Sequence, residues 1–399
     1  MDTQTPDPFS AEHMGDPYPT YHALRERGRV HRATSDGPWL VTGYEEAHRV
    51  LTDSRFGEAA GRGGRIRLSR SRREGPEQLL GRVDTMLSTE PPEHTRLRKL
   101  VSKAFTPRSI EDQRARMQQI VDELLDAVDE NEFDLVQTLA WPLPVIVIAE
   151  MLGIPREDRE RFKRWSDAMI ATTGGDYSFL AEARRSNEEL VEYVSAVMED
   201  RRRHPRADLI SRLVAAEEAG SQLSEDEILG TIALLLVAGN ETTTHLISGG
   251  MLALFRHPAE MERLRDDPAL IPSAVEEFLR FSGPVHTTRR MALEDVDLGG
   301  ARISRGEIVI AILAAANRDP AKYSEPDRFD VTRNPSDSVA FGDGIHFCLG
   351  ARLARVEAQI AIGSLLQRYP RIRLMDASPE WGGTFAVRGV KELRISTDS

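Results

Sequence analysis

The only cysteine of the chain, Cys348, lies in a glycine-rich segment directly before a stretch with helical periodicity. At a helix N-terminus, unpaired backbone N–H groups and the positive end of the helix dipole favour a thiolate over a thiol. Gly344 and Gly350 permit tight turns and close approach of a flat ligand to the backbone. Phe341 can shield the sulfur from water. The segment therefore indicates a thiolate that acts as a metal ligand or as a nucleophile.

A nucleophilic cysteine needs a general base beside it. His346 is a poor base for Cys348 because residues two apart in a sequence seldom point together. A lone cysteine is also often a small buried hydrophobic residue. It cannot form an internal disulfide, which suits a reducing compartment.

A second pair of reactive side chains, Glu241 and Thr242, lies within a long apolar stretch that we expect to form a helix over Ser224–Leu254. Ser224 and the residue three positions later form a capping-box pattern, and the following turns are apolar on nearly every side, as in a helix through the protein centre. Gly239 and the polar residues after it either end this helix or distort it and open a polar site. An acid beside an alcohol can relay protons.

The spacing Phe341-x-x-Gly344-x-His346-x-Cys348-x-Gly350 resembles the haem-ligand signature of the cytochrome P450 family. The resemblance implies that Cys348 is the axial ligand of haem b (heme b, iron protoporphyrin IX) and that the other four residues bind the cofactor. Thiolate ligation favours O–O cleavage.

Residues Ala238-Gly239-x-Glu241-Thr242 resemble the acid–alcohol segment of the same family. The resemblance implies that Ala238 and Gly239 lie against the cofactor, where the glycine leaves room for O2. Thr242 would hydrogen-bond the oxygen species and its water, and Glu241 would relay protons from solvent. The bland alternative is that the threonine hydroxyl bonds only to its own helix.

His94 and Arg98 lie four residues apart, on one face of an expected helix. By themselves they could be a solvated basic face, but the resemblance makes them contacts of the haem propionates, since two cations suit two carboxylates. It also assigns a propionate to Arg290 rather than to Arg289. A histidine that is usual in the family is replaced by Ser338, which has no imidazolium charge.

Periodicity predicts a mainly α (α+β) fold, helix-rich with small β-sheets, and we find no internal repeat or low-complexity linker. The resemblance implies one cytochrome P450 domain over residues 1–399, with the haem between the central distal helix and the helix that follows Cys348. A Glu277–Arg280 pair would support the fold. The expected helices are Tyr18–Arg27, His94–Phe105, Ser109–Val128, Asp158–Ile170, Leu180–Arg202, Ser224–Leu254, Pro258–Asp267, Ile271–Phe281 and Gly350–Arg368, and the expected strands are Trp39–Thr42, Gly306–Leu313, Phe385–Val387 and Leu393–Thr397.

Composition excludes several classes of partner. The 399 residues carry a net charge of -12, which disfavours attraction to nucleic acid or to an anionic membrane. The N-terminus has no secretory pattern, and the apolar stretches are too short or too interrupted to span a bilayer. We expect a cytoplasmic monomer that binds neither nucleic acid nor membrane.

The resemblance implies a monooxygenase that inserts one oxygen atom of O2 into a small hydrophobic, secondary-metabolite-type substrate by hydroxylation or epoxidation. The chain has no room for flavin domains, so NAD(P)H would act indirectly, through a ferredoxin and its reductase. Residues Arg62–Arg82 form a basic stretch that is either a solvated loop or a grip for a substrate carboxylate or a carrier protein. A basic docking patch for the ferredoxin is expected from Arg96, Lys99, Lys103, Arg352 and Arg355.

Three other functions remain open. One is a peroxide-driven haem-thiolate peroxygenase, which would not need the Glu241–Thr242 relay. Another is a haem-thiolate protein that binds a ligand without turnover. The third is a cysteine-nucleophile hydrolase or transferase, which would be colourless.

Overall fold

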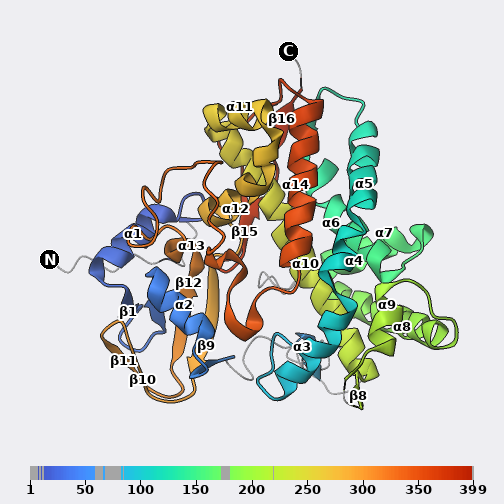
Figure 1. The fold of residues 1–399 in the computed structure, drawn as a ribbon, viewed down its shortest axis with the longest axis horizontal. Coiled ribbons are helices and arrows are strands. Elements are labelled where there is room, and N and C mark those ends of the chain that lie inside the picture. Colours follow the sequence, from blue (N-terminus) through green and yellow to red (C-terminus); the bar gives the residue numbers. More distant parts are fainter. Residues whose placement is uncertain are drawn as a thin grey trace. The chain divides into compact units, whose positions relative to one another are not determined.

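A computed structural model describes residues 8, 10, 13–58, 66–67, 82–83, 85–171, 180–218 and 220–397 (Figure 1). Contacts within the chain divide it into two compact units. Unit 1 comprises residues 1–59, 121–140 and 242–399, and unit 2 comprises residues 60–120 and 141–241. Helices predominate over short strands, as the sequence predicts. That residues 1–399 form a single domain stays a prediction.

Unit 1 contains a five-stranded sheet in the order β1-β2-β12-β9-β3, in which only the β12–β2 pair is parallel. The smaller sheets are β10–β11, β14–β15 and β13-β16-β6. The strands are β1 Val30–Arg32, β2 Trp39–Val41, β3 Phe56–Gly57, β6 Glu132–Asp134, β9 Thr287–Ala292, β10 Val296–Leu298, β11 Ala301–Ile303, β12 Ile308–Ile312, β13 Arg373–Leu374, β14 Trp381–Gly383, β15 Arg388–Val390 and β16 Arg394–Ser396.

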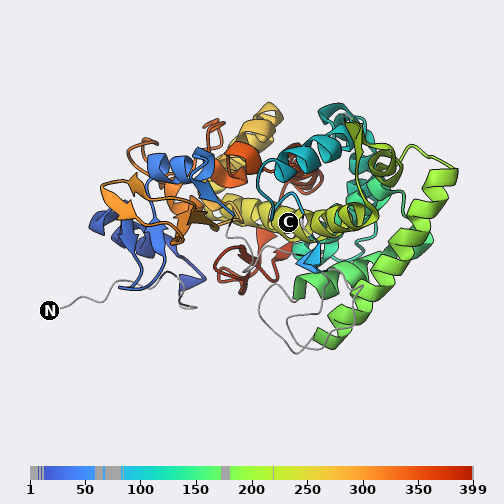
Figure 2. The same cartoon turned by 90° about the horizontal axis from the view of Figure 1, so that it is seen from below.

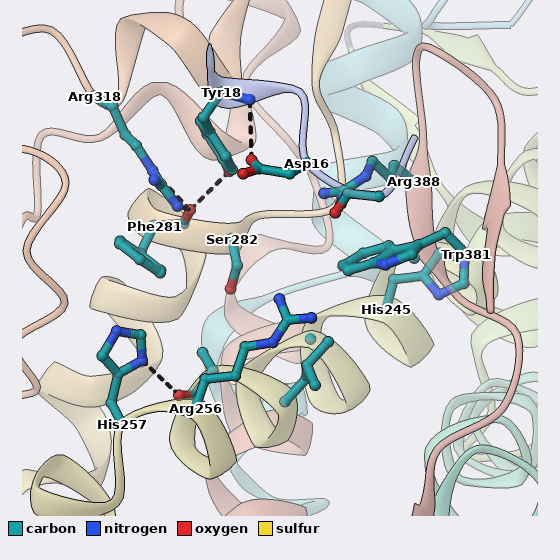
Figure 3. A pocket seen from close by; sticks show the side chains of 15 residues that line it. Asp16, Tyr18, His245, Arg256, His257, Phe281, Ser282, Arg318, Trp381 and Arg388 are labelled. Carbon is teal, nitrogen blue, oxygen red and sulfur yellow. Dashed lines mark hydrogen bonds between the residues drawn. The ribbon is translucent and has the colours of Figure 1, made fainter. Parts of the chain in front are cut away.

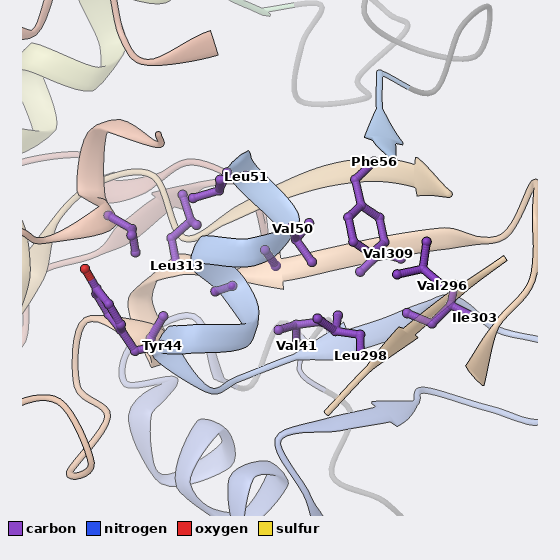
Figure 4. Packing of buried hydrophobic residues seen from close by; sticks show 14 of the residues in the cluster. Val41, Tyr44, Val50, Leu51, Phe56, Val296, Leu298, Ile303, Val309 and Leu313 are labelled. Atoms are coloured by element: carbon purple, nitrogen blue, oxygen red, sulfur yellow. The ribbon is translucent and has the colours of Figure 1, made fainter. Parts of the chain in front are cut away.

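The helices of unit 1 pack on this sheet and on each other. Buried side chains of α2, including Val50 and Leu51, contact Phe56 and Val309 of the sheet in one apolar cluster (Figure 4). Burial of such side chains is the main driving force for folding. The helical elements are α1 Tyr18–Arg27, α2 Tyr44–Thr52, the π-helix η3 Val136–Ala140, α11 Pro258–Asp266, α12 Ile271–Ser282, α13 Leu313–Ala316, the 3₁₀ turns η6 Pro268–Leu270, η7 Val339–Phe341 and η8 Gly344–His346, and α14 Ala351–Arg368.

The described residues of unit 2 form helices and two short pairs of strands. The Thr106 side chain caps α4 in a reciprocal box with Ser109, and Asp208 caps α9 while its carboxylate pairs with the buried Arg201 at 2.6 Å. Its elements are α3 Glu93–Ala104, α4 Pro107–Glu111, α6 Pro142–Leu152, η4 Arg156–Asp158, α7 Arg159–Ala171, α8 Leu180–Arg203, α9 Leu209–Ala215 and the hairpins β4 Ile66–Arg67 with β5 Arg82–Val83 and β7 Glu217–Glu218 with β8 Ser221–Gln222.

Two helices contain residues of both units. They are α5, Arg114–Asp126, and α10, Glu225–Arg256, a helix of 32 residues that is seen lengthwise in Figure 2. The capping box before α10 is confirmed: Ser224 N–H donates to Glu227 Oε2 (2.8 Å), and Glu227 N–H donates to Ser224 Oγ (3.2 Å). The α-helix continues through Gly239, so the alternative in which it ends there is wrong.

Some expected elements differ from the structure. The expected helix Ser109–Val128 is two helices, α4 and α5, because the Thr106 capping box starts a short helix that stops at Asp112. The expected strand Phe385–Val387 is wrong, since only Val387 of these residues pairs, in an isolated bridge with Val285. Hydrophobic periodicity did not predict α2, α6, α9 or β9. In the part of the chain that the structure describes, no helix combines the length and apolar character needed to cross a membrane.

Candidate active site

The Cys348 thiol is half-buried on a tight loop that precedes α14. The loop is closed by the Cys348 N–H, which donates to the Phe341 carbonyl at 3.0 Å. Two residues after the cysteine, Gly350 is the N-cap of α14, and a Cβ added to it would lie 4.0 Å from Sγ. The sulfur therefore lies beside the N-terminus of an 18-residue helix, where backbone dipoles favour the thiolate.

Glycine is required at two positions of this loop. Gly342 and Gly344 have φ of 70° and 69°, and a side chain on Gly344 would also collide with the carbonyl of Leu51 in α2. The prediction of a tight turn at Gly344 is confirmed. Gly350 also lies in a turn, in which the Ala351 N–H donates to the Cys348 carbonyl at 3.4 Å, but its φ of -83° does not require glycine. The absence of a side chain at Gly350 matters for the space beside the sulfur.

Aromatic and basic side chains hold the loop. The half-buried Phe341 ring meets Phe347 edge-on, with centroids 6.4 Å apart. Arg355 of α14 lies 4.5 Å over the Phe341 ring while Glu276 binds its guanidinium at 2.5 and 2.9 Å. This support of the loop by Arg355 was not predicted, although an arginine so early in α14 is close to the loop in the sequence. His346 ends the η8 turn in the same loop and is half-buried.

Arg290 lies on β9 in unit 1 and is buried, whereas Arg289 is exposed. The Arg290 Nη1 donates to Thr288 Oγ1 (3.1 Å) and to the carbonyl of Arg289 (3.0 Å), and Arg290 pairs with Glu58 at 2.7 Å. Alternation of side chains along the strand explains why the two arginines point apart. Glu58 was not expected, because nothing local in the sequence connects it to β9.

His94 and Arg98 lie in unit 2, four residues apart on α3. The ring of His94 is 2% exposed, and burial, with Arg98 as the second cause, lowers its pKa from the ordinary 6.5. Their placement on one helix face is confirmed. Burial thus favours the neutral form of the His94 ring, and the assignment of the pair to the haem propionates stays a prediction.

Glu241 and Thr242 are consecutive, half-buried residues in the middle of α10. Ala238 and Gly239, one turn earlier, are exposed, and a Cβ on Gly239 would meet nothing within 4 Å. One turn later, the Thr244 hydroxyl donates to the carbonyl of Ala140 at 3.1 Å. The middle of α10 thus carries an acid and an alcohol beside a bare, accessible stretch of helix.

The Glu277–Arg280 pair of α12 is confirmed as a buried structural network. Both side chains are fully buried, and Arg280 Nε and Nη2 donate to the two carboxylate oxygens at 2.7 Å. The same guanidinium donates to the carbonyls of Asn317 (3.1 Å), Pro326 (2.7 Å) and Arg328 (3.2 Å). The five oxygen atoms that accept from Arg280 belong to α12 and to the segment leading to the cysteine loop. Arg280 therefore stabilises that segment.

Other expected residues have mixed outcomes. Arg96 pairs with Glu93 and Glu227, and Arg355 with Glu276, so these two arginines are already bound to carboxylates. Lys99 and Arg352 are exposed, as docking requires. The side chains of the Arg62–Arg82 stretch lie outside the described residues. Ser338 precedes η7. The backbone N–H of the next residue, Val339, donates to Asn317 Oδ1 at 2.8 Å.

Comparison with known proteins gives a consistent result. Residues 40–374 match the model of the cytochrome P450 family. The chain is 44% identical over 391 residues to cytochrome P450 monooxygenase PikC of Streptomyces venezuelae, covering 95% of this chain and 91% of that relative. Among solved structures, the polyketide synthase cytochrome P450 PksS of Bacillus subtilis 168 has a TM-score of 0.88 at 38% identity, covering 98% of this chain and 99% of the other. P450BioI in complex with an acyl carrier protein ligated to hexadec-9Z-enoic acid has a TM-score of 0.87 at 38% identity, with coverage of 97% and 100%.

Proposed function

Because the chain belongs to the cytochrome P450 family and is a monooxygenase within it, we propose that it inserts one oxygen atom of O2 into a small hydrophobic substrate by hydroxylation or epoxidation. The observation that carries this proposal is the half-buried Cys348 thiol beside the N-terminus of α14. No general base for a cysteine nucleophile comes with it in the loop, where His346 is the only titratable neighbour in sequence besides Asp343.

The residues present fit haem b. Cys348 supplies a soft thiolate, and the bare Cα of Gly350 leaves space beside the sulfur. Arg290 is a buried cation, and Arg98 with His94 supplies further donors for propionate carboxylates. Ala238 and Gly239 offer a stretch of helix without side-chain bulk, against which a flat group could lie. When bound, the haem supplies oxygen activation, which a thiolate ligand promotes.

In this proposal, side chains of the protein deliver protons to the site. In this proposal Thr242 Oγ1 holds a water on the exposed stretch of α10, and the Glu241 carboxylate passes it protons from solvent. Both side chains are half-buried, so they can reach solvent on one side and a closed site on the other. We also propose that the Phe341 ring limits access of water to the sulfur.

Electrons come, in this proposal, from NAD(P)H through a separate ferredoxin and reductase. Lys99 and Arg352 are exposed cations that could attract an acidic partner, although Arg96 and Arg355 are bound to carboxylates within their own units. Attraction of this kind is screened by salt. Reduction by the partner should therefore slow as salt is raised from about 50 to 500 mM; a salt-independent rate would argue against electrostatic docking.

The substrate we propose is a secondary-metabolite-type hydrophobic molecule, in line with relatives named for polyketide biosynthesis. The arginines of the 62–82 stretch could grip a carboxylate on it, or the acidic surface of a carrier protein like the one bound by P450BioI. Titrating matched acids and methyl esters by haem absorbance tests the first version. Tighter binding of the acids supports it, and equal affinities exclude it.

The deciding experiment for the function is the absorption spectrum of the reduced, CO-bound protein. We expect the red-shifted Soret band of a thiolate-ligated haem, and its loss in Cys348→Ser. The haem content of both proteins, measured after extraction, controls for failure to bind the cofactor. A colourless wild-type protein, or a Ser variant that keeps the band, would overturn the proposal. Product formation with NAD(P)H and partners, rather than with hydrogen peroxide alone, separates the monooxygenase from a peroxygenase.

A further inference from the structure

A cavity of about 350 Å³ lies wholly within unit 1 and contains none of the residues assigned above to haem or oxygen (Figure 3). Its walls come from the start of α1, the last three turns of α10, the end of α12 and the β14–β15 hairpin. The volume is in the range of small-molecule sites.

Three arginines line this cavity against a single carboxylate, Asp16. Arg318 is already bound by other residues of the chain. Its Nε donates to the Phe281 carbonyl at 3.1 Å, and its Nη1 pairs with Asp327 at 3.3 Å. Its guanidinium also lies 3.3 Å from the centre of the Tyr18 ring. The charge of Arg318 is thus balanced from outside the cavity.

Arg388 is buried without a carboxylate partner among the described residues. Its Nη2 donates to the Gly15 carbonyl at 2.7 Å, its Nε to the Met14 carbonyl, and its guanidinium stacks 3.6 Å from the centre of the Trp381 ring. Burial lowers the pKa of Arg388. Tyr18, Tyr21 and Asp16 oppose the shift, and Arg256 adds a smaller lowering effect. Burying a cation that only neutral groups contact lowers the stability of the folded protein.

Arg256, the last residue of α10, is the second uncompensated cation. Its guanidinium points into the cavity (Figure 3) and forms no hydrogen bond or ion pair with the residues that the structure describes. It is exposed, and it lies close enough to Arg388 to disfavour that residue's charge. Two of the three guanidinium groups that line the cavity therefore repel each other, and among the described lining residues Asp16 is the only carboxylate.

Apolar side chains also line the cavity. Leu252 and Ala253 of α10, with the rings of Phe281 and Trp381, line the same space. An inorganic ion would satisfy the charges but leave this surface in water. A molecule with a carboxylate and a flat hydrocarbon body would satisfy both.

We propose that this cavity is a second ligand site, which binds a small organic carboxylate between Arg256 and Arg388 with its apolar body against Trp381 and Leu252. Guanidinium groups bind carboxylates through paired, charge-assisted hydrogen bonds. The bound anion would neutralise the repulsion between the two arginines and provide the partner that Arg388 lacks.

The test uses the haem-containing protein and benzoate as the probe. Calorimetric titration should show binding that weakens about tenfold or more in Arg256→Gln, since a charge-assisted hydrogen bond contributes about that much. Arg371→Gln is the matched control, because Arg371 is exposed and lies outside the cavity. Benzamide, which has the same shape without the charge, should bind at least tenfold more weakly than benzoate.

The haem absorbance distinguishes this site from the substrate site. In the same titrations, the Soret band should stay unchanged while benzoate binds, because no residue of the proposed haem site lines the cavity. Binding that shifts the Soret band with the same affinity, binding that is equal in Arg256→Gln and wild type, or no benzoate binding at millimolar concentration would each overturn the proposal.

Discussion

Glu357 of α14 makes protein stability dependent on pH in an unusual direction. The side chain is fully buried in the helix that follows the cysteine loop, and its Oε1 accepts no hydrogen bond from the described residues. Burial alone raises its pKa from 4.5 to about 8. At neutral pH the folded protein therefore keeps this carboxyl protonated, whereas the unfolded chain releases the proton.

The sign and size of the effect follow from linkage. A carboxyl whose folded pKa is raised contributes stability that is fully present below about pH 4.5 and is lost as pH rises towards 8. Between pH 5.5 and 7.5 the loss is about 1.4 kcal/mol per pH unit, or about 2.7 kcal/mol in all. For a chain of 399 residues, about 2 cal/mol/K of unfolding entropy per residue converts this loss to a fall of about 3 °C in Tm.

The perturbation is Glu357→Gln, which keeps the shape and removes the titration. We expect its Tm to fall by about 3 °C less than that of the wild type between pH 5.5 and 7.5, in melts monitored by the loss of helical circular dichroism. Glu26→Gln is the control, because Glu26 is exposed on α1, and it should follow the wild type. If wild type and Glu357→Gln show the same pH dependence, the carboxyl does not titrate in this range and the reasoning fails.

Three further predictions concern the active site and its support. Thr242→Ala should keep haem and substrate binding but lower product formed per NAD(P)H consumed by about tenfold or more, with peroxide as the by-product; unchanged coupling would contradict its role in proton delivery. Gly344→Ala should destabilise by about 2 kcal/mol and lower haem retention, because φ is 69° and the Leu51 carbonyl blocks a side chain, whereas Gly363→Ala in α14, where a Cβ meets nothing within 4 Å, should be neutral or stabilising in the same melts. Arg280→Lys should cost about 3 kcal/mol in urea unfolding, because a lysine cannot serve the five acceptors of the buried guanidinium; a loss below about 1 kcal/mol would show that the network is not needed.

The parts of the site that could be predicted are those whose signals are local in the sequence. The cysteine loop, the cap of α10 and the Glu277–Arg280 pair each depend on residues within a few positions of one another. The expected helices that became α1, α12 and α14 were confirmed with nearly the predicted bounds. Local propensity and capping determine such features with little help from the rest of the chain.

The features that could not be predicted depend on contacts between distant segments. Glu58 pairs with Arg290 across more than 200 residues, and Gly344 needs its bare Cα because α2 places the Leu51 carbonyl against it. Strand β9 reads as an irregular basic segment, and only its pairing with β12 makes it a strand. Tertiary pairing overrides local preference in such short strands.

The environment of the proposed propionate ligands changes what the sequence implies about haem binding. The three residues counted as cations in the sequence are, in the structure, His94, whose pKa is lowered by burial, Arg290, which is already paired with Glu58, and Arg98. Burial explains the first, because it disfavours the charged form of a histidine. Before a carboxylate is bound, these residues therefore offer less positive charge than their number suggests, and hydrogen-bond donors would contribute to the recognition of the proposed propionates. Ser338 in place of a histidine fits this pattern, since its hydroxyl can donate a hydrogen bond while adding no charge.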